Sequence, residues 1–246
     1  MTRVDTAAWL SLVAAASAPY ARSGRFARHF ARGKLRWDPV FRHLIDRGLI
    51  APRARVLDIG CGQGLLASLL VAAGTASRRG VWPSSWANAP VDAHVTGIEL
   101  MPHDVARARG ALGPAADIVC ADMRLSAFPR ADTVVMLDVL HYVSLREQDE
   151  LLGRARNALV DGGRLVLRVG DSASRFGFAA SQWVDRVVML MRGRGRRAPT
   201  GRSRAEWHAC LVALGFEVAS ESMHRGTPFA NVLFVGTLPP SAARAP

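Results

Sequence analysis

The sequence predicts an α/β fold, in which a parallel sheet is covered by helices on both faces. Short apolar runs alternate with longer helical patterns along most of the 246 residues, and this alternation is typical of parallel sheets. A Gly-x-Gly-x-Gly turn joins the first such run to a helical pattern. Half of the residues are hydrophobic, so the chain has enough apolar side chains for a large core.

The N-terminal part of the chain is predicted to be helical. Residues 7–35 indicate one or two helices with mixed apolar and basic faces. Asp38 and Pro39 then suit the N-cap and the first position of a further helix, and Gly48 is placed to end it.

The stretch Val56–Gly64 predicts a buried strand at about 54–59, a tight glycine turn, and the start of a helix that runs to Gly74. Because glycine lacks a Cβ atom, it adopts positive φ easily and lets a ligand approach the backbone. The turn also directs the unpaired N–H groups of a helix start toward that ligand. The chain lacks the Gly-Lys-Ser/Thr of a P-loop, and Leu65 replaces the third glycine of a dinucleotide fingerprint.

The later elements follow in order. Residues 75–93 are a polar insertion that contains Pro and Trp, and Pro102 begins the next helix. Ser144 and Ser203 each begin a capping box, with Glu three residues later, and the first of these helices is expected to include Leu159. Further strands are predicted at about 95–100, 116–121, 132–137, 164–169, 216–220 and 231–235.

Charge and cysteine content limit the possible functions. The net charge of +12 comes almost entirely from arginine, which is clustered at 22–36 and 192–204. Such clusters suit nucleic acid, anionic lipid or an acidic carrier, or simply form a solvated basic surface. The three cysteines lack C-x-x-C spacing, so we expect reduced thiols, a cytoplasmic location and no metal site. No apolar run is long enough for a transmembrane segment, and the alanine-rich start is not interpreted as a secretion signal.

The pattern Asp58-x-Gly60-x-Gly62-x-Gly64 after a strand resembles motif I of the class I S-adenosylmethionine-dependent methyltransferases. The resemblance covers about 36–237. It implies methyl transfer with S-adenosylmethionine as cofactor. It also implies a Rossmann-like, doubly wound sheet of seven mostly parallel strands with an antiparallel last strand, plus N-terminal helices and a helical lid. The predicted divisions are an N-terminal helical cap at 1–50, a methyltransferase domain at 51–238, a substrate lid at 171–202 and a disordered tail at 239–246.

The same resemblance implies a set of cofactor contacts. Glu99 ends a strand where the family places the acid that accepts hydrogen bonds from the ribose diol. Asp58 would order the loop and the amino end of the cofactor, Asp122 would accept from the adenine amine, and Lys34 would pair with the cofactor carboxylate. The predicted cofactor-binding residues are Lys34, Asp58, Gly60, Cys61, Gly62, Gly64, Glu99, Leu100, Asp122, Met123 and Asp138. The alternatives are a surface acid at Glu99 and a helix-capping acid at Asp122.

His141 is the predicted catalytic residue. It follows the strand at 132–137, where the family lines its reaction centre. An imidazole is suited to general-base catalysis near neutral pH. The alternative is a structural histidine. Methyl transfer depends mainly on in-line positioning, so an acceptor that is already anionic needs no base.

Four segments, 24–35, 97–102, 137–142 and 226–232, resemble bacterial methyltransferases associated with aryl-polyene biosynthesis. This likeness implies secondary metabolism and an aromatic acceptor, either a small molecule or a group carried on an acyl carrier protein, methylated at oxygen or carbon. A basic rim would suit an acidic carrier.

Other functions stay open. One is an RNA methyltransferase that uses the arginine-rich surface, although nothing in the sequence resembles an RNA-binding module. The absence of an Asn/Asp-Pro-Pro-Tyr/Phe motif argues against amino-methylation of DNA bases or glutamine. Another is a cofactor-binding protein without transfer activity. The apolar stretch 183–191 is interpreted as part of the substrate lid, with an ordinary cover helix or a peripheral membrane helix as alternatives.

Overall fold

The computed structural model describes residues 3–170, 201–223 and 231–240. The chain forms two compact units, Met1–Val135 and Met136–Pro246. Most of the predicted lid at 171–202 and of the predicted tail at 239–246 lies outside the described residues.

The described residues form a seven-stranded sheet with the strand order β3-β2-β1-β4-β5-β7-β6. The strands are β1 (Arg55–Ile59), β2 (His94–Glu99), β3 (Ala116–Cys120), β4 (Ala131–Leu137), β5 (Leu159–Gly170), β6 (Glu217–Ser222) and β7 (Asn231–Thr237). β1 pairs in parallel with β2, and β2 with β3, whereas β7 lies antiparallel to both β5 and β6. The predicted mostly parallel sheet with an antiparallel last strand is therefore confirmed.

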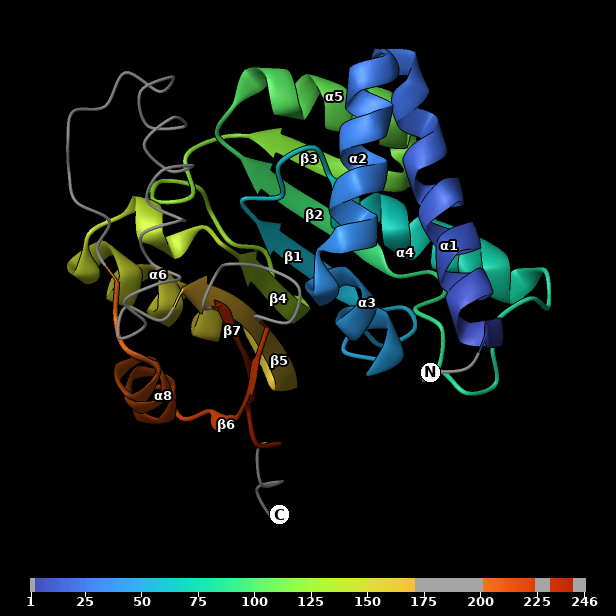
Figure 1. Cartoon of the computed structure of the whole chain (residues 1–246). Helices are drawn as coiled ribbons and strands as arrows, with labels where there is room; N and C mark the ends of the chain where they lie inside the picture. Colours follow the sequence, from blue (N-terminus) through green and yellow to red (C-terminus); the bar gives the residue numbers. More distant parts are fainter. Residues whose placement is uncertain (1–2, 171–200, 224–230, 241–246) are drawn as a thin grey trace, which may run out of the picture. The chain divides into compact units, whose positions relative to one another are not determined.

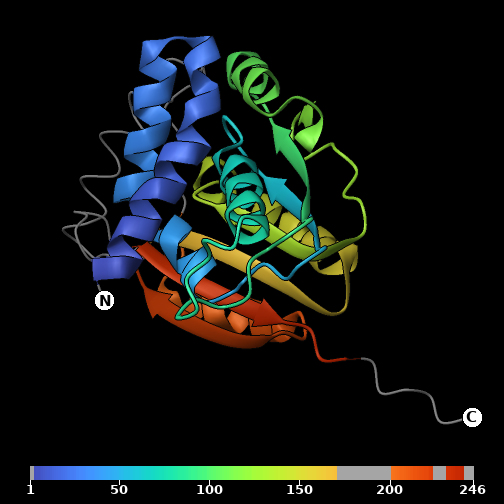
Figure 2. The same cartoon turned by 90° about the vertical axis from the view of Figure 1, so that its right-hand side faces the viewer.

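The first unit also contains most of the helices. They are α1 (Arg3–Ser17), the 3-10 helix η1 (Ala18–Ser23), α2 (Arg25–Trp37), α3 (Pro39–Asp46), α4 (Leu65–Arg78), α5 (Pro102–Leu112) and the 3-10 helix η2 (Gly113–Ala115). Figures 1 and 2 show α1 and α2 lying side by side, and α1 also packs against α4. Asp38 caps α3 as predicted, because its carboxylate accepts a hydrogen bond from the Val40 amide.

The helix α1 covers α4 through a stripe of buried side chains. Trp9, Leu12, Val13 and Ala16 are all buried, at spacings of three and four residues. Although α1 is rich in alanine, no helix within residues 3–170, 201–223 and 231–240 has both the length and the apolarity to cross a membrane.

The helix α4 is longer than predicted, since it continues past Gly74 to Arg78. Gly74 is buried inside the helix, and the turn with positive φ occurs instead at Gly80. The insertion therefore begins only after α4. It is held by specific contacts: Trp82 and Trp86 meet edge to face at 5.1 Å, and the Ser85 hydroxyl donates to Asp5 at 2.6 Å.

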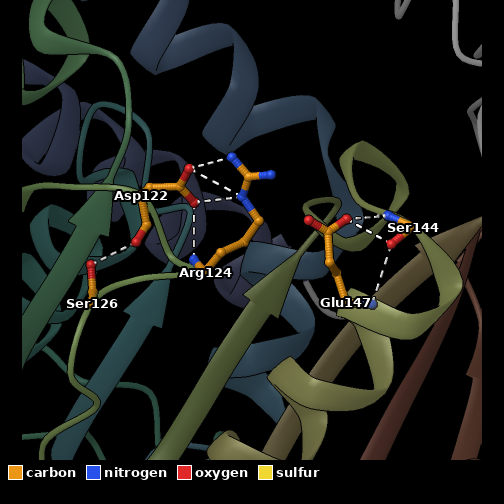
Figure 3. A network of polar contacts seen from close by, with 5 residues as sticks. All are labelled: Asp122, Arg124, Ser126, Ser144 and Glu147. Carbon is orange, nitrogen blue, oxygen red and sulfur yellow. Dashed lines mark hydrogen bonds and ion pairs between the residues drawn. The ribbon is translucent and has the colours of Figure 1, made fainter.

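The second unit contains the 3-10 helix η3 (Leu140–Tyr142) and the helices α6 (Leu145–Ala158) and α8 (Arg204–Ala213). Both predicted capping boxes are present; Figure 3 shows the reciprocal contacts between Ser144 and Glu147. Leu159 was expected in the helix but begins β5 instead, because its backbone is already extended (φ −69°, ψ 144°).

Candidate cofactor site

The glycine loop between β1 and α4 is fixed to the end of β2. The amides of Gly60 and Cys61 both donate to the Ile98 carbonyl, at 2.8 and 3.2 Å, and the Gly64 amide donates to the Cys61 carbonyl at 2.9 Å. The carboxyl end of β1 and the start of α4 are thus held in one tight turn beside the next strand. This is the edge of a parallel sheet where ligands bind in α/β folds.

All three glycines of the loop have positive φ, but they differ in their surroundings. A Cβ atom added to Gly64 (φ +73°) would lie 2.7 Å from Leu112 Cδ1, so this glycine permits close packing against α5. A Cβ atom added to Gly62 (φ +55°) would meet nothing within 4 Å. Gly62 therefore borders open space, where a side chain would project toward any ligand of the loop.

The side chain of Cys61 is directed at β2. A Cβ atom added to Gly97 would lie 2.7 Å from the Cys61 sulfur, so a glycine at this position makes room for the thiol. Burial raises the pKa of the Cys61 thiol far above its ordinary value. The Cys61 side chain is consequently neutral and packs against β2. Any contact of Cys61 with a ligand of the loop would therefore come from its backbone.

Glu99, at the end of β2, links the loop to the following turn. Its Oε2 accepts a hydrogen bond from the Gly62 amide at 3.0 Å, and its Oε1 accepts from the Met101 amide at 2.8 Å. The side chain is only 7% exposed. Each oxygen keeps a further lone pair, so the fixed carboxylate can still accept two donated hydrogen bonds such as those of a diol.

Asp58, at the end of β1, is a second buried acid. It is 4% exposed, and the described part of the chain gives its carboxyl group no hydrogen-bond partner. Burial, together with the nearby Glu99 carboxylate, raises its pKa to about 7. Such a carboxyl group is suited to receive a cationic group such as an ammonium.

A contact that the sequence did not predict also fixes the loop. The hydroxyl of Tyr20, a residue of η1, donates a hydrogen bond to the Gln63 carbonyl at 2.8 Å. Tyr20 is fully buried, and burial raises its pKa, so it remains a neutral donor. Nearby, the Ser68 hydroxyl donates to the Ala16 carbonyl at 2.7 Å. No local pattern connects Tyr20 with a residue 43 positions later.

Asp122 forms a local turn just after β3, as Figure 3 shows. Its carboxylate accepts from the Arg124 amide at 2.9 Å and is paired with the Arg124 guanidinium at 2.6 Å. The Ser126 hydroxyl donates to the Asp122 carbonyl at 2.8 Å. Within the described residues, no helix lies between Asp122 and β4, so the Asp122 carboxylate stabilises a turn rather than caps a helix, and the adenine contact stays a prediction.

The other predicted cofactor residues of the first unit are placed as follows. Lys34 lies in α2 and forms an ion pair with Asp38 at 2.7 Å. Leu100 follows Glu99 and is 39% exposed, and Met123 is half-buried in the turn after Asp122. A half-exposed leucine next to the Glu99 carboxylate is suited to contact an aromatic ring.

The second unit contains Asp138 and His141. Asp138 has positive φ (+57°), and both of its carboxylate oxygens bind the guanidinium of the buried Arg168 on β5. The Asp138 amide also donates to the Arg168 carbonyl at 3.1 Å. His141 lies in η3 with its ring 3.9 Å from that of Tyr142. The Asp138–Arg168 pair therefore fixes the backbone that leads to His141.

The residues of the first unit suit S-adenosylmethionine in their chemistry. Glu99 offers acceptors for two hydroxyl groups, Asp58 offers a carboxylate for an ammonium, and Gly62 leaves space at the loop. The hydrogen bond from the Gly62 amide to Glu99 brings the loop after β1 together with the carboxyl end of β2, a contact that the motif alone does not specify.

The chain matches a protein-family model described as "Methyltransferase domain" over residues 26–221. No curated protein sequence matches it. Many solved structures, in contrast, match this chain. The magnesium protoporphyrin IX methyltransferase ChlM from Synechocystis PCC 6803, with bound S-adenosylhomocysteine, has a TM-score of 0.57 at 18% identity, covering 87% of this chain and 88% of that one.

Two further solved structures show the same fold. An O-methyltransferase family protein from Burkholderia thailandensis has a TM-score of 0.59 at 17% identity, covering 89% of this chain and 62% of that one. The [4+2]-cyclase SpnF has a TM-score of 0.56 at 16% identity, covering 83% of this chain and 82% of that one. This chain thus spans less than two thirds of the Burkholderia protein. Because the family model covers well over half of the sequence, the chain belongs to the methyltransferase domain family, whose members use S-adenosylmethionine.

Proposed function

We propose that this chain transfers the methyl group of S-adenosylmethionine to an aromatic acceptor, either a small molecule or a group carried on an acyl carrier protein, at oxygen or carbon. The observation that carries the cofactor part is the buried Glu99 carboxylate, fixed by the amides of Gly62 and Met101. A carboxylate held in this way is preorganised to accept the ribose diol without further ordering.

The proposed cofactor-binding residues of the first unit have distinct roles. Glu99 accepts the two ribose hydroxyls, Asp58 pairs with the ammonium of the methionine part, and the loop from Gly60 to Gly64 allows close approach of the backbone. Leu100 packs on the adenine ring. Tyr20 holds the Gln63 carbonyl and thereby keeps the loop in its conformation.

When bound, S-adenosylmethionine would supply an electrophilic methyl group and would leave as S-adenosylhomocysteine. An acceptor hydroxyl would also have to lose its proton. His141 is the proposed base for that proton. The ion pair of Asp138 with Arg168 positions the segment that carries His141.

The acceptor class rests on likeness rather than on a contact. Four segments of the sequence resemble methyltransferases associated with aryl-polyene biosynthesis. One similar structure is named as a magnesium protoporphyrin IX methyltransferase and another as an O-methyltransferase family protein. SpnF, named as a [4+2]-cyclase, shares the fold, so transfer itself has to be measured.

The test is incubation of the full chain with methyl-labelled S-adenosylmethionine and a panel of acceptors, followed by mass spectrometry. The panel contains phenolic acids, the same acids attached to an acyl carrier protein, and RNA. We expect one phenolic acceptor to gain the mass of one labelled methyl group, with no gain for Gly62→Val. Labelling of RNA alone would favour the nucleic-acid alternative. No product with any acceptor, despite cofactor binding, would favour a protein without transfer activity.

A further inference from the structure

The helix α2 exposes large aromatic side chains. Its buried face consists of Ala27, Ala31 and Leu35, which follow one another at intervals of four residues. On the outward side, Phe26 is 74% exposed, Phe30 44% and Trp37 72%. Exposed aromatics gathered on one helix are unusual for a soluble surface and mark a site of interaction.

These aromatics form one stripe. At about 100° per residue, positions i, i+4 and i+11 fall within roughly 40° of one another around a helix. Phe26, Phe30 and Trp37 have this spacing, so they line one side of the outward face. A second, parallel stripe is basic and consists of Arg25, Arg28, Arg32 and Arg36.

The basic stripe has no acidic counterpart within α2. Residues 22–37 contain no Asp or Glu. Lys34 is paired with Asp38. Among the described residues, Arg22, Arg25, Arg28, Arg32 and Arg36 form no ion pair. The guanidinium of Arg36 lies 4.8 Å from the ring centre of Trp37, so the two stripes meet at the end of the helix. The face thus combines unneutralised positive charge with apolar rings.

We propose that the outward face of α2 docks on an anionic phospholipid membrane. In an amphipathic helix at a bilayer surface, aromatic rings enter the headgroup boundary while arginines remain at the level of the phosphates. Each basic residue near an anionic leaflet adds to the attraction. Single-stranded nucleic acid also binds arginine and aromatic groups, but it is usually held in a groove. The face here is the convex side of a single helix.

The proposal goes beyond methyl transfer and does not depend on it. It gives a function to the arginines of the cluster at 22–36, which the proposed cofactor site does not use.

The experiment measures binding of the full chain to vesicles. Vesicles of phosphatidylcholine alone are compared with vesicles of phosphatidylcholine and phosphatidylglycerol in equal parts, by co-sedimentation. We expect the anionic vesicles to bind at least about tenfold more strongly. Added salt should weaken this binding, because the charges are exposed.

Matched variants locate the contact. The triple variant Arg25→Gln/Arg28→Gln/Arg32→Gln should bind anionic vesicles at least about tenfold more weakly. The control variant Arg47→Gln/Arg79→Gln/Arg156→Gln removes the same charge from exposed arginines elsewhere and should lose less than about threefold.

The aromatic stripe has its own controls. Phe26→Ser should weaken binding, whereas Leu125→Ser, at a residue that is 87% exposed, should not. Trp37→Phe should keep binding but abolish the blue shift of tryptophan fluorescence that vesicles cause in the wild type. Equal binding to both vesicle types, or equal losses in the two triple variants, would overturn the proposal. So would binding of single-stranded RNA through α2 in the absence of vesicle binding.

Discussion

The hydroxyl of Tyr20 donates a hydrogen bond to the backbone carbonyl of Gln63, 2.8 Å away and 43 residues later in the chain. Through this contact, the short helix η1 holds the glycine loop. Glu99 holds the same loop through the Gly62 amide. The loop is therefore fixed at two successive residues by buried groups from distant parts of the chain.

Replacing Tyr20 by phenylalanine tests the first of these contacts. The variant leaves the Gln63 carbonyl without its buried donor, which costs about 1–3 kcal/mol of stability. We also expect S-adenosylhomocysteine to bind about three- to tenfold more weakly, because the loop is less ordered before binding. Denaturation and calorimetric titration measure the two effects.

Thr75→Ala is the control for Tyr20→Phe. The Thr75 hydroxyl donates only to the Val71 carbonyl within α4, so its loss removes a hydroxyl without touching the loop. Affinity equal to that of the wild type in Tyr20→Phe would show that the Tyr20 contact has no part in cofactor binding.

The buried carboxyl of Asp58 predicts a pH-dependent stability. Its pKa is raised from 3.8 to about 7 in the folded chain, so the unfolded chain loses the proton first as pH rises. The stabilising contribution of Asp58 is fully present below about pH 4 and is lost by about pH 7. The free energy of unfolding should therefore fall by roughly 4 kcal/mol at most over this range. Asp58→Asn cannot ionise and should lack this decrease. Urea denaturation of both proteins from about pH 4 to pH 8 measures it, and parallel curves would contradict the raised pKa.

The same carboxyl predicts proton release on cofactor binding. If an ammonium pairs with ionised Asp58, it lowers the pKa of that group, and binding near neutral pH releases a proton. Calorimetric titrations with S-adenosylhomocysteine in buffers of different ionisation enthalpy detect such a proton. The release should disappear in Asp58→Asn, and its persistence there would assign it to another group.

Gly62 and Gly64, two of the three glycines of the loop, should respond differently to alanine. Both substitutions add strain of about 1–2 kcal/mol, because φ is positive. Gly64→Ala also places a Cβ atom 3.2 Å from Ala108 Cβ and 2.7 Å from the end of the Leu112 side chain, so it should destabilise the fold more than Gly62→Ala does. Gly62→Val should abolish cofactor binding, because a branched side chain enters the open space beside the loop. Circular dichroism checks folding, and a Gly62→Val protein that binds normally would refute the assignment.

His141 separates two mechanisms of transfer. If it is the base, His141→Gln should lower kcat by about 10²–10⁴-fold and leave cofactor affinity nearly unchanged. The wild-type pH–rate profile should then contain an ionisation that the variant lacks. If His141 only packs against Tyr142, the profile keeps its shape and the rate stays within about threefold. The second outcome would leave positioning of an ionised acceptor as the mechanism.

The sheet and the glycine loop could be predicted because their signals are local. Alternating apolar runs, the turn from Gly60 to Gly64 and the capping box at Ser144 each depend on residues within a few positions of one another. The end of α4 was predicted wrongly because Gly74, read as a stop, is instead buried within the helix. Leu159 was placed in a helix by its apolar spacing, although its extended backbone starts a strand.

The contacts that complete the candidate site could not be predicted, because they join distant residues. Tyr20 reaches Gln63, Gly97 makes room for Cys61, and Arg168 binds Asp138 across strands. Each depends on which side chains the fold brings together, and no spacing in the sequence encodes that. The arginine cluster in α2 was visible as charge, but only the structure shows which helix face it occupies.

Calorimetric titration of S-adenosylhomocysteine into the wild type and Glu99→Ala tests the central claim most directly. Glu99 ties the loop to the end of β2 and is the proposed acceptor of the ribose diol, so its loss should weaken binding by about 1.5–3 kcal/mol. Glu150→Ala removes an exposed carboxylate that pairs with Arg146 and should bind as the wild type does. A folded Glu99→Ala protein with unchanged affinity would remove Glu99 from the cofactor site and contradict the account.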